Sequence, residues 1–166
     1  MHVGRMPRTE EPNPAAISTE GENLMTNPTP FRLVIVESPY AGDIEANEAY
    51  ARAAMRDCLL LGDAPYASHL LYTQAGVLQD TDKAERKLGM EAGFAWGEKA
   101  DATIVYSDLG ISSGMAAGMD RAAAAGRPIE ERHLLAGTNA AGQLEWSSPN
   151  EPATIEALRQ LALAAQ

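Results

Sequence analysis

The sequence predicts an α/β domain in which a mostly parallel sheet is covered by helices on both faces. Two apolar runs, Phe31 to Val36 and Ala102 to Tyr106, have the length and composition of buried strands. Segments with helical spacing of their apolar residues alternate with these runs along the chain. Strands that alternate with helices are joined by right-handed crossovers, and such crossovers build a parallel sheet between two layers of helices.

The first strand and helix are expected at the start of the ordered chain. Phe31 to Val36 forms the strand, and the polar segment Ser38 to Asp43 interrupts it. Asp43 can cap the helix that follows, because its carboxylate can accept from the unpaired N–H groups of a first helical turn. The helix is predicted over Ile44 to Leu61 and ends at Gly62.

A second strand and a second helix follow. Ala64 to Ser68 predicts a short strand, and Leu70 to Gln79 is interpreted as a loop over the sheet edge. Thr81 or Asp82 then caps a helix that extends to about Lys99.

The remaining elements complete the alternation. Ala102 to Tyr106 is the third strand, a helix follows over Ser113 to Ala125, and His133 to Ala136 is interpreted as a fourth strand. The charged residues Glu130 to His133 are expected to be a solvated cluster before that strand. Asn150 to Gln166 predicts an amphipathic helix.

Three glycines at spacings of four, Gly89, Gly93 and Gly97, mark one face of the second long helix. Each costs about 1 kcal/mol relative to alanine in a helix, so another element is expected to pack closely there. That element is either a neighbouring helix of the same chain or a second copy of the protein, with the dimer seam beside Met90, Phe94 and Trp96.

The chain is expected to hold one domain over residues 31–166, preceded by a disordered tail over residues 1–30. Five prolines among polar residues give the tail no apolar periodicity. Met25 is an alternative natural start.

The composition excludes several classes of partner and site. A net charge of −10 and the lack of a basic stripe argue against polymeric nucleic acid. The chain has no apolar run long enough for a membrane span, and its single cysteine, Cys58, fits packing in a reducing, cytoplasmic environment. We expect no metal, because His2, His69 and His133 lack partners at ligand spacing.

Polar residues gather where the predicted strands end. Glu37 to Asp43, Ser68-His69 and Asp108 to Gly114 all follow strands, and ligands of parallel sheets bind beyond the carboxyl ends of the strands. Ser112-Ser113-Gly114 opens a helix, so its free N–H groups and hydroxyls can hold a phosphate or carboxylate.

Each of these residues also has a structural interpretation. Ser112 and Ser113 can be an ordinary helix cap, and Asp108 can serve a turn with Leu109-Gly110. His69 can be a hydrogen-bonded histidine at a strand end, and Tyr40 either stacks on a ligand or packs in the fold.

Several short segments resemble one family when they are taken in order: Ser38-Pro39-Tyr40-Ala41-Gly42-Asp43, Ala49-Tyr50-Ala51-Arg52, Pro65-Tyr66-Ala67-Ser68-His69, Asp108 and Ser112-x-Gly114. The series resembles the nucleoside 2-deoxyribosyltransferase superfamily. It is most similar to the deoxynucleoside-monophosphate N-glycosidase branch and to related small proteins encoded by phages. The resemblance spans about residues 31 to 132.

The resemblance implies a flavodoxin-like or Rossmann-like three-layer sandwich. It further implies a homodimer or higher homo-oligomer that binds a nucleoside or nucleotide and cleaves or exchanges its N-glycosidic bond. We expect no cofactor. The phosphate would bind at Ser112 and at the N–H groups of Ser113, Gly114 and Met115. Asp108 would act near the base, and the remaining nucleotide-binding residues would be Ser38, Tyr40, Gly42, Asp43 and His69.

The chain departs from the family pattern at Gly118, where a glutamate nucleophile is expected. Glu37 and Glu91 are candidate replacement carboxylates, whereas Asp120 should point away because it lies about 200° further round a helix. Three functions stay open. The protein can be an N-glycosidase or transferase, an inactive protein that sequesters a nucleotide, for example a phage protein that binds a host immune signal, or a protein that only mediates assembly.

Overall fold

The structure, a computed structural model, describes residues 31–151 of the 166-residue chain. The predicted tail lies outside these residues, as does the predicted C-terminal helix beyond Glu151. The elements are β1 (Arg32–Glu37), α1 (Ile44–Leu60), β2 (Asp63–Tyr66), α2 (Ser68–Leu71), α3 (Lys83–Gly97), β3 (Ala102–Tyr106), α4 (Ser113–Ala124), β4 (Ile129–Arg132), β5 (Leu135–Thr138) and β6 (Leu144–Ser147).

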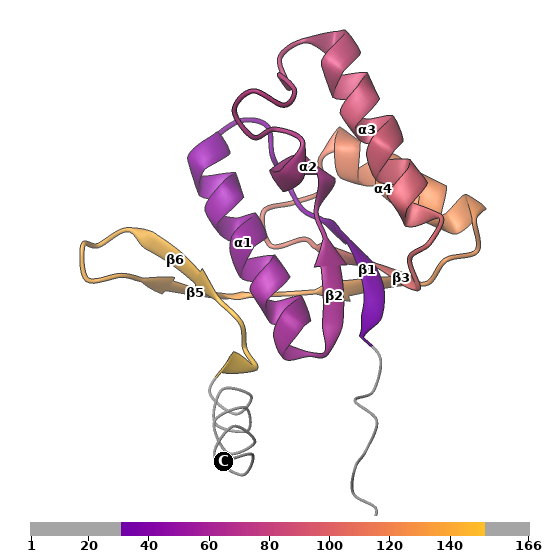
Figure 1. The fold of residues 1–166 in the computed structure, drawn as a ribbon. Helices are drawn as coiled ribbons and strands as arrows, with labels where there is room; N and C mark the ends of the chain where they lie inside the picture. Colours follow the sequence, from indigo (N-terminus) through magenta and orange to yellow (C-terminus); the bar gives the residue numbers. More distant parts are fainter. Residues whose placement is uncertain (1–30, 152–166) are drawn as a thin grey trace, which may run out of the picture. The chain divides into compact units, whose positions relative to one another are not determined.

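Four parallel strands form the main sheet, in the order β2-β1-β3-β4. The chain moves from β1 to β2 in one direction and from β2 to β3 and β4 in the other. Right-handed crossovers therefore place α1 on one face and α3 and α4 on the opposite face (Figure 1). This confirms the predicted three-layer α/β fold with a mostly parallel sheet.

The core lies between α1 and the two central strands. Val34 and Val36 of β1 and Ile104 of β3 are fully buried, as a strand covered on both faces requires. Cys58 of α1 is also fully buried in this core, and loss of hydration raises the pKa of its thiol to about 11. The thiol is therefore protonated and packed, as the sequence predicted.

The first half of the chain follows the prediction closely, except after β2. Asp43 caps α1 and Asp82 caps α3, each accepting from backbone N–H groups of the first turn. The strand predicted to end at Ser68 ends at Tyr66 instead, and the predicted loop begins as the short helix α2. Ser68 packs directly on α3, a tertiary contact that overrides the local strand pattern.

The prediction of a fourth strand of the sheet over His133 to Ala136 was wrong. The sheet is completed by Ile129–Arg132, and the next residues belong to the separate β5–β6 hairpin. Glu130 and Arg132 are tolerated in β4 because they join an ion-pair network with Arg32 and Asp63. The predicted solvated cluster is therefore an edge strand, where charged side chains also discourage pairing with other chains.

The glycine-marked face of α3 packs against its own chain. A Cβ at Gly93 would lie 2.9 Å from Ser68 Cβ of α2, and one at Gly97 would lie 3.1 Å from the Arg127 guanidinium. Of the two interpretations of this face, intrachain packing is therefore the one that the contacts bear out at these positions. Within residues 31–151, no helix has the length and apolar character needed to cross a membrane.

Candidate functional site

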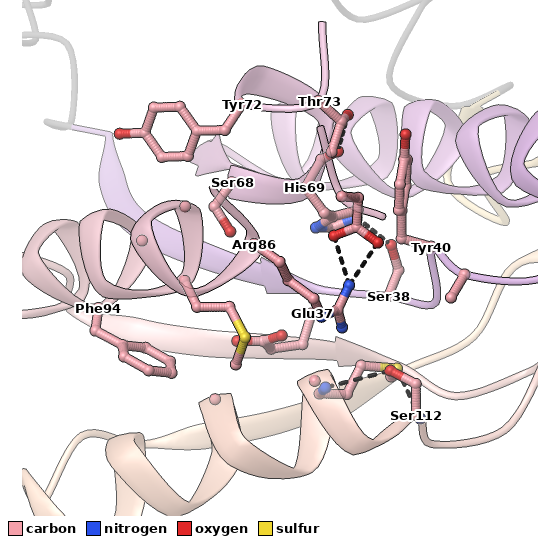
Figure 2. Close-up of a pocket in the computed structure, with 18 of the residues that line it drawn as sticks. Glu37, Ser38, Tyr40, Ser68, His69, Tyr72, Thr73, Arg86, Phe94 and Ser112 are labelled. Atoms are coloured by element: carbon pink, nitrogen blue, oxygen red, sulfur yellow. Dashed lines mark hydrogen bonds and ion pairs between the residues drawn. The ribbon is translucent and has the colours of Figure 1, made fainter. Parts of the chain in front are cut away.

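A cavity of about 140 Å³ opens at the carboxyl edge of the sheet, between the end of β1, α2, α3 and the start of α4 (Figure 2). A void of about this size in another protein takes up benzene, so the volume suits an aromatic ring rather than a single ion. The residues lining it include eight of those predicted from the sequence: Glu37, Ser38, Tyr40, His69, Ser112, Ser113, Gly114 and Met115.

One part of the cavity gathers groups that can bind an anion. Ser112 caps α4, and its Oγ accepts a hydrogen bond from the Met115 N–H at 3.3 Å. Among the described residues, the N–H groups of Ser113 and Gly114 have no hydrogen-bond acceptor, as expected for a first helical turn. These two N–H groups and the positive end of the α4 dipole therefore point to the binding of a negatively charged group.

Arg86 adds a positive charge at the same place. Its Nη2 atom lies 3.5 Å from the position of a Cβ at Gly114, beside the first turn of α4. Its Nη1 atom donates to Asp80 Oδ2 at 2.6 Å, and Asp80 also lines the cavity (Figure 2). Within the described part of the chain, Nη2 makes no hydrogen bond, so it can donate to a ligand.

Ser38, His69 and Tyr40 form a second wall. Ser38 Oγ and His69 Nε2 are 2.8 Å apart, and the Tyr40 ring meets the imidazole edge to face at 6.3 Å between centroids. Loss of hydration lowers the pKa of His69 to about 4, so the imidazole is neutral near pH 7. This wall offers a hydroxyl and two rings without any charge, which suits a neutral, planar group.

Glu37 presents a carboxyl group to the cavity from the end of β1. Across residues 31–151, no hydrogen bond or ion pair holds this carboxyl. Loss of hydration raises its pKa from 4.5 to about 8, and the charge of Arg127 opposes this increase. A Cβ at Gly118 would lie 1.9 Å from Glu37 Oε1, so the carboxyl occupies space beside α4 that only a glycine leaves free.

Four predicted site residues lie outside the cavity lining. Asp108 accepts from Tyr50 Oη at 2.7 Å, the Leu134 N–H at 3.0 Å and His133 Nδ1 at 3.0 Å. Burial raises its pKa, but these hydrogen bonds outweigh burial and keep the pKa below the ordinary value. Glu91 is exposed beside Arg121, while Gly42 and Asp43 form the turn and cap before α1.

Sequence reasoning missed Asp80, Arg86 and Arg127, and it gave Met90 and Phe94 only to a possible dimer seam, although all five line the cavity. Ser68, which the sequence placed beside His69 at the strand ends, also lines the cavity. A usable signal was present for Arg86. It precedes Gly89 by three residues, and residues three apart share one face of a helix. Because the glycine-marked face borders the cavity, Arg86 had to point the same way.

The side chains of the described residues do not form a metal-binding group. In the part of the chain that the structure describes, no group of three or more His, Cys, Asp or Glu side chains could hold a metal ion. The charged groups that line the cavity are acids and arginines, which act here by hydrogen bonding and electrostatics.

Comparisons with known proteins give a family and a fold relative. No curated protein matches the chain. A solved 2-deoxyribosyltransferase from the psychrotolerant bacterium Bacillus psychrosaccharolyticus is similar, with 16% identity, a TM-score of 0.46, and coverage of 61% of this chain and 72% of that chain. Likeness at this level is distant and carries no argument about activity. The profile of a family described as a domain of unknown function, DUF7768, matches residues 32–132, and the chain therefore belongs to that family.

Proposed function

We propose that the protein binds a nucleoside phosphate in the cavity and acts on its N-glycosidic bond. The observation that carries the proposal is that the Arg86 guanidinium lies beside the first turn of α4 in a cavity whose second wall, formed by Ser38, Tyr40 and His69, carries no charge. An anionic group would bind at Ser113 and Gly114, and a planar base would bind against the uncharged wall.

The sequence resemblance supports the same ligand. The segments that carry it include Ser38, Tyr40, His69 and Ser112, and these four side chains line one cavity although they come from three segments that are distant in sequence. A set of residues gathered in this way is what a binding site on an open α/β sheet requires.

Calorimetry with matched ligands tests the proposal. The 5′-monophosphates of the common ribonucleosides and deoxyribonucleosides should bind more tightly than the corresponding nucleosides. Arg86→Gln should weaken monophosphate binding by about 10-fold to 100-fold, because a hydrogen bond to a charged group contributes about 1.5–3 kcal/mol. It should leave nucleoside binding nearly unchanged. Equal loss for both ligand classes would argue against a phosphate at this position.

A second function, capture of an intact nucleotide, is favoured by Gly118, since α4 carries no carboxylate there. A protein that only sequesters a ligand needs affinity and no group that acts in a transition state. Mass spectrometry on ligand released by denaturation separates the two functions. More than one equivalent of free base would establish turnover, whereas stoichiometric recovery of intact nucleotide would establish capture.

A further inference from the structure

Glu37 is the residue of the cavity whose environment is hardest to explain by packing alone. It ends a strand whose preceding residues, Val34, Ile35 and Val36, are buried. A carboxylate near such a strand is costly unless it is paired, and nothing within residues 31–151 pairs with this one. The pKa of about 8 means that the group avoids this cost near pH 7 by keeping its proton.

Gly118 of α4 leaves the space that the Glu37 carboxyl occupies. It is buried in the middle of α4, where glycine costs about 1 kcal/mol relative to alanine. A Cβ at this position would lie 1.9 Å from Glu37 Oε1 and 2.5 Å from Cδ, so even a methyl group would force the carboxyl to move. The glycine therefore keeps the carboxyl where it is, and Figure 2 shows Glu37 pointing into the space between α3 and α4.

The spacing of Gly114 and Gly118 on α4 indicates how far the Glu37 carboxyl lies from the predicted anion site. The two residues are four positions apart on α4, which is about 6 Å along the helix axis. The Glu37 carboxyl, beside Gly118, therefore lies about one helical turn from the N–H groups that can hold a phosphate. A pentose attached to that phosphate spans a distance of this order, so its anomeric carbon can approach the Glu37 carboxyl.

We propose that Glu37 is the catalytic acid of the reaction and that Gly118 provides the space for its carboxyl. The inference rests on the proposed function, since it requires a nucleoside phosphate in the cavity. It assigns the catalytic group to the end of β1 rather than to α4.

The reaction balances with Glu37 and water alone. The bond from the anomeric carbon to the base breaks, and its electron pair goes to the base, which takes a proton from the Glu37 carboxyl. Water adds to the anomeric carbon, and the proton that it loses returns to the Glu37 carboxylate. The products are free base and the sugar phosphate, and the acid is restored for the next turnover.

The other charged or titratable groups around Glu37 are compatible with this role. Arg127 lies close enough to oppose the increase in its pKa, and Arg86, Asp80 and Glu85 on the α3 side line the same cavity. His69 on the α2 side is neutral near pH 7, so it neither competes for the proton nor repels the base. Loss of one general acid typically costs about 10²-fold to 10⁴-fold in rate.

The test compares wild-type protein, Glu37→Gln and Glu45→Gln, an exposed matched control in the first turn of α1. Each is incubated with the ribonucleoside and deoxyribonucleoside 5′-monophosphates, free base is quantified by chromatography, and binding of intact nucleotide is measured by calorimetry. Wild type and the control should release base beyond one equivalent. Glu37→Gln should be at least about 100-fold slower, with affinity within about threefold of wild type.

Two results would overturn the assignment and leave nucleotide binding intact: wild-type turnover by Glu37→Gln, and binding of nucleotide by the wild type without release of base. Absence of binding by every monophosphate would instead overturn the proposed function together with the inference. Thermal unfolding of each variant checks that a slow protein is folded, so that loss of rate can be assigned to the carboxyl.

Discussion

The carboxyl of Glu37 occupies the space that a side chain at position 118 would need, because a Cβ at Gly118 would lie 1.9 Å from Glu37 Oε1. One residue ends a central strand and the other lies in the middle of a helix on the same face of the sheet. This contact sets the position of the Glu37 carboxyl, which has no partner within residues 31–151, and it requires a glycine at position 118.

Gly118→Ala should reduce base release more than it reduces stability. The new methyl group displaces the carboxyl, but that carboxyl is the free end of a flexible side chain, and alanine favours the helix by about 1 kcal/mol. We expect a change in the free energy of unfolding within about 1 kcal/mol and a loss of rate of about 10-fold or more. Denaturation curves and base release measure the two effects, and undiminished turnover would show that the carboxyl position does not matter.

Base release should fall as pH rises through about 8, because Glu37 then loses the proton that it donates. The pH–rate profile of the wild type for kcat/KM, which reports the ionising groups of the free protein, should show this descending limb. Glu37→Gln cannot lose a proton, so its residual rate should lack the limb. A wild-type profile that stays level well above this pH would exclude Glu37 as the acid.

Glu37→Gln should stabilise the fold at high pH in the absence of any ligand. The folded state holds the Glu37 proton to about pH 8, whereas the unfolded chain releases it near 4.5. The folded state therefore binds more protons between these values, so the wild type loses stability as pH rises across this window. Urea denaturation at about pH 6 and about pH 9 should show a relative gain for the variant at the higher pH. Equal differences at both pH values would show that Glu37 ionises as easily as in the unfolded chain.

Asp80→Asn should tighten monophosphate binding. Asp80 holds Arg86 Nη1 and brings a negative charge to the cavity in which we propose that the phosphate binds. Removing that charge should increase affinity by about 3-fold to 10-fold, and the increase should shrink as salt is added. Calorimetry at two salt concentrations measures both. Weaker binding would mean that Asp80 holds Arg86 in its productive position.

Asp108→Asn should lower the free energy of unfolding by about 1–3 kcal/mol. The two carboxylate oxygens accept hydrogen bonds from the Leu134 N–H, Tyr50 and His133, whereas an asparagine amide has only one oxygen that can accept. Thermal unfolding measures the loss. Lost turnover with unchanged stability would instead favour the role near the base that the sequence resemblance implies for Asp108.

Local signals in the sequence predicted the elements that are self-contained. The continuous apolar run Ala102 to Tyr106 is β3 without any change of boundary, and Asp43, Asp82 and Ser112 cap the helices that follow them. Such signals are reliable because a buried strand and a helix cap each depend on the chemistry of a few consecutive residues.

Long-range contacts decided what the sequence did not predict. Ile129–Arg132 has one apolar residue followed by three charged ones, so its sequence does not indicate a strand. Its backbone pairs with β3, and its charges pair with Arg32 and Asp63, which are distant in sequence. Arg86 lines the cavity because it lies on the glycine-marked face of α3, and the neighbours of that face are set by tertiary contacts. The Glu37–Gly118 contact joins residues 81 positions apart (118 − 37), so neither residue alone indicates it.

The contact between the Glu37 carboxyl and Gly118 also constrains how such a site can change over evolution. A chain with an acid at both 37 and 118 must rearrange the backbone or side chains around these positions, because the two side chains need the same space. A chain with a small residue at both positions has no carboxyl in that space. A lineage that moves its carboxylate between helix and strand must therefore pass through one of these two states. Among related sequences, an acid at position 37 should accompany glycine at position 118, and a larger residue at 118 should accompany a small one at 37.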